Sequence, residues 1–233
     1  MSQQEQKSDI VIRIRQLSRF YESEGERVDV LNDLSLDIER GQVLSVEGVS
    51  GAGKSTFLHV IGGIDRANSG SIEVFGKEVT LLNGTQIEQF RATTVGFIFQ
   101  HHYLLPDFTV IENVMMPLWI LRQPIAIIRQ KAITMLERVG LGHRLEHYPS
   151  QISGGEMARA GVARALVGDK SLILADEPTG NLDRANSEKL VDLLWQLQSE
   201  LGFNMILVTH DMELAGRVPN RYRLRNGNLQ RFN

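Results

Sequence analysis

Residues 48–55 constrain the fold of this chain more than any other feature. They read Gly-Val-Ser-Gly-Ala-Gly-Lys-Ser, which fits G-x-x-x-x-G-K-[ST] at every fixed position. An apolar run typical of a buried strand, Gln42–Glu47, precedes them, and a helical pattern from about Lys54 to Gly62 follows. A strand, a glycine loop and a helix in this order predict a phosphate-binding loop.

Each residue type in this loop has a chemical reason. Glycines let successive backbone N–H groups converge on phosphate oxygens, and the N-terminus of the following helix adds partial positive charge. Lys54 supplies a mobile charge for the β- and γ-phosphates, and the Ser55 hydroxyl can hold Mg²⁺. The alternative is an ordinary glycine turn, for which a chance match is on the order of one per cent. The predicted nucleotide contacts here are Gly48, Ser50, Gly51, Gly53, Lys54, Ser55 and Thr56.

A second acidic element follows a later apolar strand, Ser171–Ala175. Asp176 and Glu177 come directly after it, and successive side chains of a strand point to opposite faces. We therefore expect Asp176 to face the metal ion, directly or through water. We expect Glu177 to be the general base that polarises a water in line with the γ-phosphate. The alternative, acidic residues that only cap a strand or helix, becomes a minor one beside a phosphate loop.

Strands and helices alternate along much of the chain. A helix is predicted from about Arg184 to Leu201, between two apolar strands. This alternation indicates a parallel sheet with helices on its faces. The turn Asn226-Gly227 predicts a terminal hairpin. The further predicted strands are Ser71–Phe75, Val95–Phe99, Asn204–Val208, Tyr222–Leu224 and Asn228–Phe232.

The stretch 101–167 has a different character. Strand signals disappear there, and helical periodicity appears in Ile125–Val139 and Glu156–Val167. The simplest account is one α/β core interrupted by a helical insertion. The predicted parts are a frayed tail at 1–9, the nucleotide-binding core at 10–100 and 168–233, and a helical subdomain at 101–167.

Composition excludes several function classes. The formal net charge of −3 argues against a protein that holds nucleic acid by bulk charge. The absence of cysteine excludes a disulfide framework, a thiolate nucleophile and zinc or iron–sulfur sites built on thiolates. The longest apolar run, Val114–Leu121, contains Pro117 and falls short of the ~20 residues that a bilayer requires. We therefore expect no membrane span, and residues 1–9 lack the apolar segment of a secretory leader.

A third motif, Ile152-Ser-Gly-Gly-Glu156, carries a family resemblance. It is similar to the signature of the nucleotide-binding subunits of ABC transporters, usually Leu-Ser-Gly-Gly-Gln, and the sequence resembles that family over nearly all of residues 11–231. The resemblance implies ATP hydrolysis with Mg²⁺ on a P-loop, RecA-like α/β core that has a mainly parallel sheet, an N-terminal antiparallel β portion and an inserted helical subdomain. It also implies a homodimer in which Ser153, Gly154, Gly155 and Glu156 of one copy bind the ATP of the other.

The remaining family positions follow in order. By resemblance, Gln100 senses the γ-phosphate, and Asp183 in Asn181-Leu-Asp contacts the nucleotide site across the dimer. His210 matches the histidine that contacts the γ-phosphate. Tyr21 matches the aromatic residue that stacks on adenine, although an aromatic next to a strand is more often part of a core. The implied catalytic residues are Glu177, His210 and Gln100, and the implied metal ligands are Ser55, Gln100 and Asp176.

One residue pair departs from the family pattern, and two histidines do not form a metal site. Met157-Ala158 stands where relatives generally have Arg-Gln, which predicts weaker polar contacts across the dimer and puts the hydrolysis rate in question. His143 and His147 lack the further ligands of a zinc site and are interpreted as surface histidines.

The segment from Gln100 to Val114 resembles the lipoprotein-releasing branch of the family, whereas Ala175–Asp183 is shared with macrolide-exporter-type and cell-division-type ATPases. The closer resemblance implies a peripheral subunit on the cytoplasmic face of the inner membrane, beneath two integral membrane subunits. The expected docking residues for those partners are Tyr103, Leu104, Leu105 and Phe108 within 100–108, with packing inside the helical insertion as the alternative.

Other functions remain as alternatives. A macrolide-exporter-type or cell-division-type ATPase would use hydrolysis for mechanotransmission, and a regulatory module would bind ATP with little turnover. A non-transporting relative in DNA repair or translation is disfavoured, because the chain has one cassette, no cysteines and no long coiled coil between phosphate loop and signature.

Overall fold

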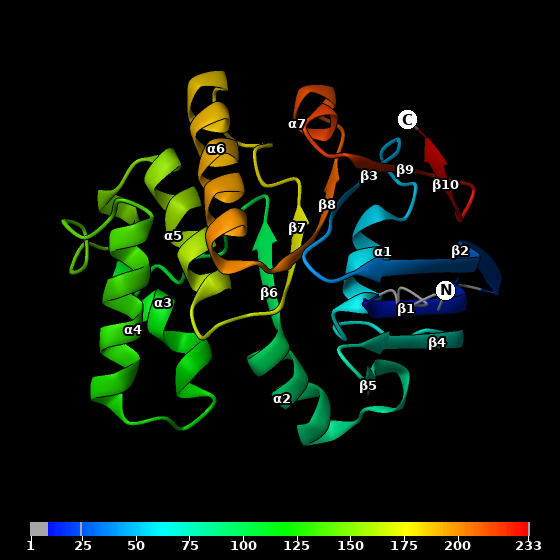
Figure 1. The fold of residues 1–233 in the computed structure, drawn as a ribbon, viewed down its shortest axis with the longest axis horizontal. Coiled ribbons are helices and arrows are strands. Elements are labelled where there is room, and N and C mark those ends of the chain that lie inside the picture. Colours follow the sequence, from blue (N-terminus) through cyan, green and yellow to red (C-terminus); the bar gives the residue numbers. More distant parts are fainter. Residues whose placement is uncertain (1–8, 24, 233) are drawn as a thin grey trace, which may run out of the picture.

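The computed structural model describes residues 9–23 and 25–232 and contains two sheets (Figure 1). The larger sheet has six strands in the order β10-β9-β3-β8-β7-β6, and its pairs are parallel except for the terminal hairpin β9–β10. The predictions of a mainly parallel sheet and of a C-terminal hairpin are therefore confirmed. The strands are β3 (Val43–Glu47), β6 (Val95–Phe99), β7 (Leu172–Asp176), β8 (Asn204–Thr209), β9 (Asn220–Arg225) and β10 (Asn228–Phe232).

The parallel strands are apolar on both faces because each face is covered. Ile173 and Ala175 of β7 belong to one buried cluster, whereas the alternating residues Leu172 and Leu174 belong to another. The first cluster packs under the helices of 110–201, and the second packs under α1 (Lys54–Ile61) and the smaller sheet. Covered faces explain why these strands read as continuous apolar runs rather than as alternating ones.

The smaller sheet is antiparallel, in the order β2-β1-β4-β5, which confirms the expected N-terminal antiparallel β portion. The strand predicted at Ser71–Phe75 lies in this sheet as β4 and pairs with β1, not with the parallel strands. In β1 the buried alternation of Ile12 and Ile14 breaks at Gln16, whose φ is +48°, and resumes at Leu17. Such a bulge interrupts the two-residue period by which a strand is recognised in sequence. The strands are β1 (Ile10–Ser23), β2 (Glu26–Glu39), β4 (Ser69–Val74) and β5 (Lys77–Glu78).

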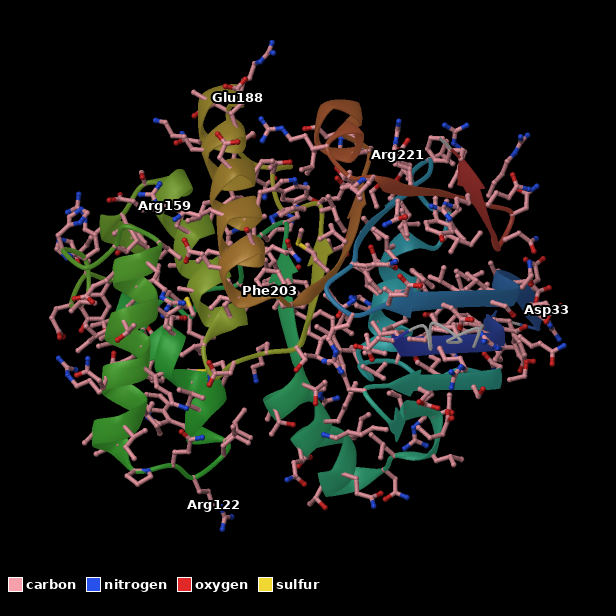
Figure 2. The ribbon with its side chains drawn as sticks, viewed as in Figure 1. Asp33, Arg122, Arg159, Glu188, Phe203 and Arg221 are labelled. Atoms are coloured by element: carbon pink, nitrogen blue, oxygen red, sulfur yellow. The ribbon has the colours of Figure 1, made fainter. Side chains whose placement is uncertain are left out.

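The stretch between β6 and β7 is helical, as expected. The predicted helices correspond to α4 (Ile125–Arg138) and α5 (Gly154–Leu166), and α3 (Val110–Trp119) is an addition that the sequence did not indicate because Pro117 interrupts its pattern. In Figure 2, Arg122 extends into solvent from the turn between α3 and α4, at the tip of this helical layer. The boundaries of a subdomain at 101 and 167 stay a prediction. The other helices are α2 (Gly84–Thr94), α6 (Arg184–Leu201), α7 (Met212–Gly216) and the short 3₁₀ turns η1 (Val79–Leu81) and η2 (Pro149–Gln151).

Residues 1–8 of the predicted tail lie outside the described residues, and Asp9 accepts a hydrogen bond from Nε of Arg40 at 2.7 Å. Within the described ranges, no helix combines the length and the apolar character that a bilayer crossing requires.

Candidate functional site

A cavity of about 680 Å³ lies where β3, β6, β7 and β8 end. Parallel strands present their carboxyl ends at one edge, so the segments that follow them converge there. The carboxyl ends of β6, β7 and β8 point to the upper edge in Figure 1, and Glu188 near the start of α6 marks the same edge in Figure 2. The cavity is lined by Val30, Gly48, Val49, Ser50, Gly51, Gly53, Lys54, Ser55, Thr56, Gln100, Asp176, Glu177 and His210.

The glycine loop needs its glycines for two separate reasons. Gly51 and Gly53 have φ values of +79° and +96°, in the left-handed region that disfavours other residues. A Cβ on Gly53 would lie 2.6 Å from Cγ1 of Val30, and one on Gly48 would lie 2.8 Å from the carbonyl oxygen of Leu224. The loop is therefore a backbone cradle that a side chain would fill.

Lys54 already points its charge into this cradle. Its Nζ donates to the carbonyl oxygen of Gly48 at 2.8 Å and to that of Val49 at 3.2 Å. Ser55 is exposed at the start of α1, and Thr56 follows it along the cavity wall. A phosphate can therefore replace these two neutral carbonyl oxygens as the partner of the Lys54 ammonium group. Among the described residues, Lys54 has no salt bridge that would have to break first.

Glu177 is held in place on three sides. Its backbone has a φ of +46°, and its N–H donates to the carbonyl oxygen of Val208 at 2.9 Å. Its Oε2 accepts from the Thr209 hydroxyl at 2.9 Å and from the backbone N–H of His210 at 3.2 Å. Its Oε1 lies 2.8 Å from Nδ1 of His210. The side chain is only 13% exposed, so these contacts fix the direction in which the carboxylate faces the cavity.

Gln100 is oriented by a residue whose contact the sequence did not reveal, Asn181. The amide Nδ2 of Asn181 donates to the main-chain carbonyl oxygen of Gln100 and lies 3.0 Å from Nδ1 of His101. A carbonyl oxygen only accepts, so this bond fixes the Asn181 amide with its Oδ1 toward Nε2 of Gln100, at 3.3 Å. The Oε1 of Gln100 is therefore the amide atom left for a ligand.

The donor set suits Mg²⁺. The Ser55 hydroxyl, the Gln100 amide oxygen and the Asp176 carboxylate line one cavity, and Mg²⁺ prefers such oxygen donors. No group of three or more His, Asp or Glu side chains poised to hold a metal occurs among the described residues. Magnesium is commonly bound by one or two carboxylates together with substrate phosphates, so the arrangement fits an ion that arrives with a nucleotide.

Ser153 caps the N-terminus of α5. Its hydroxyl accepts from the backbone N–H of Glu156 at 3.3 Å, while Oε2 of Glu156 accepts from the Ser153 N–H at 2.8 Å and from its hydroxyl at 2.9 Å. The pKa of Glu156 falls to about 2, first because the Ser153 backbone N–H donates to its carboxylate. A Cβ on Gly155 would lie 2.8 Å from Oδ1 of Asn186, so this turn packs closely on the start of α6.

The turn at 153–156 does not line the phosphate-loop cavity of its own chain. Its residues Ser153 and Gly154 are exposed. Asp183 lies beside this turn as the N-cap of α6, where its Oδ1 accepts from the backbone N–H of Asn186 at 2.9 Å. That bond lowers the pKa of Asp183. Three of the predicted nucleotide contacts, Ser153, Gly154 and Asp183, are thus exposed and do not line the phosphate-loop cavity of the same chain.

Tyr21 also lies away from the cavity. Its hydroxyl donates to Oδ2 of Asp65 at 2.7 Å, and the Arg19 guanidinium lies 4.1 Å from the centre of its ring. The neighbouring strand instead contributes Val28 and Asp29 to a second hollow of about 830 Å³ beside the glycine loop. The stacking role of Tyr21 stays a prediction.

Burial corrects the interpretation of Ala158, whereas that of Met157 stays a prediction. Ala158 is 1% exposed inside the helical core, and Met157 packs partly against the same core. Ala158 therefore has no side chain available to contact a second copy. Alanine in place of the polar residue that relatives generally have here changes packing inside the helical core, not a contact across a dimer. His143 is a surface residue as expected, whereas His147 is half-buried and lies against Arg144.

The four predicted docking residues divide into two pairs. Tyr103 and Leu105 are exposed, at 61% and 39%. Leu104 packs against the helical core, and Phe108 lies edge-on to Trp119 with ring centres 6.5 Å apart. Beside Tyr103, a hollow of about 630 Å³ lies between α2, β6, α3 and α5 and is lined largely by apolar side chains.

Buried Asn113 holds this segment in shape, a role the sequence did not reveal. Its Oδ1 accepts from the Leu105 N–H at 2.7 Å, and its Nδ2 lies 3.1 Å from the Leu105 carbonyl oxygen and 3.0 Å from those of Phe108 and Thr109. The side chain is fully buried. One amide therefore joins Leu105, Phe108 and Thr109, and it adds to the turn bond from the Phe108 N–H to the Leu105 carbonyl oxygen.

We expect Asn113→Leu to lower the free energy of unfolding by about 2–4 kcal/mol, because it removes the partner of the Leu105 N–H and of the Phe108 carbonyl oxygen. Urea unfolding measures this loss. Gln196→Leu, at an exposed amide on α6, is the control and should change the free energy by less than about 0.5 kcal/mol. A loss equally small at Asn113 would contradict the assigned role.

Comparisons with known proteins agree with this geometry. A family model described as ABC transporter matches residues 31–180. The chain is 46% identical to the lipoprotein-releasing system ATP-binding protein LolD of Myxococcus xanthus, over 94% of this chain and 98% of that protein. It is 43% identical to the protein of the same name from Pseudomonas fluorescens, over 94% and 96%.

Solved structures agree as well. The chain resembles a dimeric post-hydrolysis state of the ATP-binding cassette MJ0796 bound to ADP and Pi, with a TM-score of 0.86 and 30% identity over 95% of this chain and 99% of that one. A second dimeric structure of MJ0796, described as a bacterial ABC transporter cassette, also gives a TM-score of 0.86, with 33% identity over 94% and 97%.

Proposed function

The chain belongs to the ABC transporter family, and from this premise we propose that it is the ATP-hydrolysing subunit of a membrane complex that releases lipoproteins. One observation carries the ATPase assignment: the phosphate loop, Asp176, Glu177, Gln100 and His210 line a single cavity although they come from distant segments. The lipoprotein assignment rests on relatives of that name, which this chain matches over nearly its whole length. These relatives favour lipoprotein release over a macrolide-exporter-type or cell-division-type role.

The glycine loop binds the triphosphate. Backbone N–H groups and the N-terminus of α1 face the phosphate oxygens, and the Lys54 ammonium leaves its carbonyl partners for the β- and γ-phosphates. Ser55, Gln100 and Asp176 would hold Mg²⁺, which would neutralise charge on the phosphates.

Glu177 acts as the general base. Its carboxylate takes a proton from a water molecule as the water oxygen attacks the γ-phosphorus, and the bond to ADP breaks. His210 and Thr209 hold that carboxylate, and the exposed imidazole of His210 contacts the γ-phosphate in this proposal. Glu177, Thr209 and His210 together orient the attacking water molecule and direct the transfer of its proton to the Glu177 carboxylate.

Two copies complete the site. The turn at 153–156 and Asp183 do not line the cavity of their own chain, and Ser153, Gly154 and Asp183 are exposed, so each serves the nucleotide of a second copy in a head-to-tail dimer. The dimeric structures of MJ0796 support this arrangement. The dimer is a peripheral subunit at the cytoplasmic face of the inner membrane and docks integral membrane partners near residues 100–108; nucleic acid is not among its partners.

The function is tested on the intact complex. Membranes solubilised with a tag on this chain should yield integral membrane subunits, and the purified complex in vesicles should release an embedded lipoprotein when ATP and Mg²⁺ are added. Release that is equally fast without ATP, or hydrolysis with no release of lipoprotein, would contradict the proposal.

We expect Leu105→Asp to abolish co-purification of the membrane subunits, because it places a charge on an exposed apolar residue of the docking segment. The ATPase activity of the isolated subunit should remain. Leu81→Asp on η1 is the matched control, because Leu81 is also an exposed apolar residue and, unlike exposed Val49, does not line the phosphate-loop cavity. Undiminished co-purification of the Leu105 variant would move the docking site elsewhere.

A further inference from the structure

Glu156 places a negative charge on the turn that is proposed to bind phosphate, at a position where the family more often has neutral glutamine. Its pKa of about 2 means that the carboxylate is ionised at neutral pH. The carboxylate lies in the first turn of α5, on the N–H and hydroxyl of Ser153.

This charge is large compared with the field that the turn offers to an anion. A helix N-terminus is equivalent to roughly half a positive elementary charge. One carboxylate in the first turn outweighs it and leaves about half a negative charge facing the phosphates of the second copy. Glu156 without a partner would therefore repel the ligand that the turn is proposed to bind.

Arg144 supplies the missing positive charge. Its Nε donates to Oε1 of Glu156 at 2.9 Å, and the two side chains are 33% and 12% exposed. Its NH1 lies 3.1 Å from Nε2 of His147, which must accept because a guanidinium only donates. His143 also approaches Oε1 of Glu156, with Nε2 at 3.9 Å, but its side chain is 63% exposed. Arg144 is thus the close, half-buried cation, and it restores the positive sign of the turn.

We infer that Arg144 is a positioning residue of the phosphate-binding turn at 153–156. It neutralises Glu156 and holds that carboxylate on Ser153, so that Ser153 and the following glycine N–H groups present net positive charge to the triphosphate of the second copy. This inference rests on the proposed function, in which the turn closes on the ATP of a second chain.

The test compares one substitution in two backgrounds. In protein stalled by Glu177→Gln, we expect Arg144→Gln to raise the dissociation constant of the dimer formed with ATP and Mg²⁺ by about tenfold or more, as for loss of a charge-assisted hydrogen bond. When Glu156→Gln is also present, the same Arg144→Gln change should cost less than about twofold. Arg144→Lys keeps the charge and should restore most of the affinity. Sedimentation velocity measures all of these constants.

Two further measurements separate this role from simple support of the fold. Binding of fluorescent ATP to the monomer should be unchanged by Arg144→Gln, because Arg144 does not line the phosphate-loop cavity. Arg129→Gln is the matched control: Arg129 bonds Glu146 at the same distance of 2.9 Å in the same helical region and does not contact the turn. That control should change dimerisation by less than about twofold.

The outcomes distinguish the inference from the function on which it rests. Equal losses from Arg144→Gln in both backgrounds, or no loss in either, would overturn the role of Arg144 alone. A stalled parent protein that stays monomeric with ATP and Mg²⁺ would overturn the proposed dimeric site, and this inference with it.

Discussion

Glu177→Gln should lower the turnover of ATP by about 10²–10⁴-fold, the usual contribution of a general base. The amide keeps the shape of the carboxylate and an oxygen that can accept from Thr209 and from the His210 backbone. It is too weakly basic to take a proton from water. Steady-state phosphate release measures the loss, and ATP affinity should stay within about twofold because the phosphate loop is intact.

Glu200→Gln is the matched control, at an exposed carboxylate near the end of α6 that accepts a hydrogen bond from the Gln196 amide at 2.8 Å. It should leave turnover unchanged. If Glu177→Gln retained full turnover, Glu177 would be a structural partner of His210 and another group would have to activate the water.

Lys54→Ala should remove nucleotide binding, with affinity reduced by about 100-fold or more. The Lys54 ammonium is a permanent side-chain charge on the wall of the phosphate-loop cavity, and charge-assisted contacts with phosphate are the strong ones. Titration with a fluorescent ATP analogue measures the affinity of the monomer. The same titration should also show loss of the Mg²⁺-dependent part of binding, because the ion arrives with the phosphates.

Lys131→Ala provides the comparison, since Lys131 lies on α4 with Asp169 3.9 Å away and has no place in the cavity. Its affinity for ATP should equal that of the unchanged protein. Normal affinity in Lys54→Ala would show that the glycine loop binds phosphate without the lysine, and the assigned role of Lys54 would be wrong.

Much of the fold was readable from local pattern. Buried parallel strands appear as apolar runs at Val43–Glu47, Leu172–Asp176 and Asn204–Thr209, since both faces of the sheet are covered. The antiparallel strands were harder to locate, because bulges at Gln16 and Asp33, both with φ of +48°, break the alternation that marks a half-buried strand.

The sequence by itself determined which chemical groups this protein carries: a phosphate loop, acidic residues at a strand end and a capped glycine turn are short motifs whose residues are neighbours in the chain. Only the tertiary structure decided which partners hold them, as with Asn181 on Gln100, Arg144 on Glu156 and Asn113 on the 105–109 loop. It also placed Tyr21 on Asp65 rather than at the cavity. Such contacts join residues that chain spacing does not relate, because they arise only when separate helices and strands pack together.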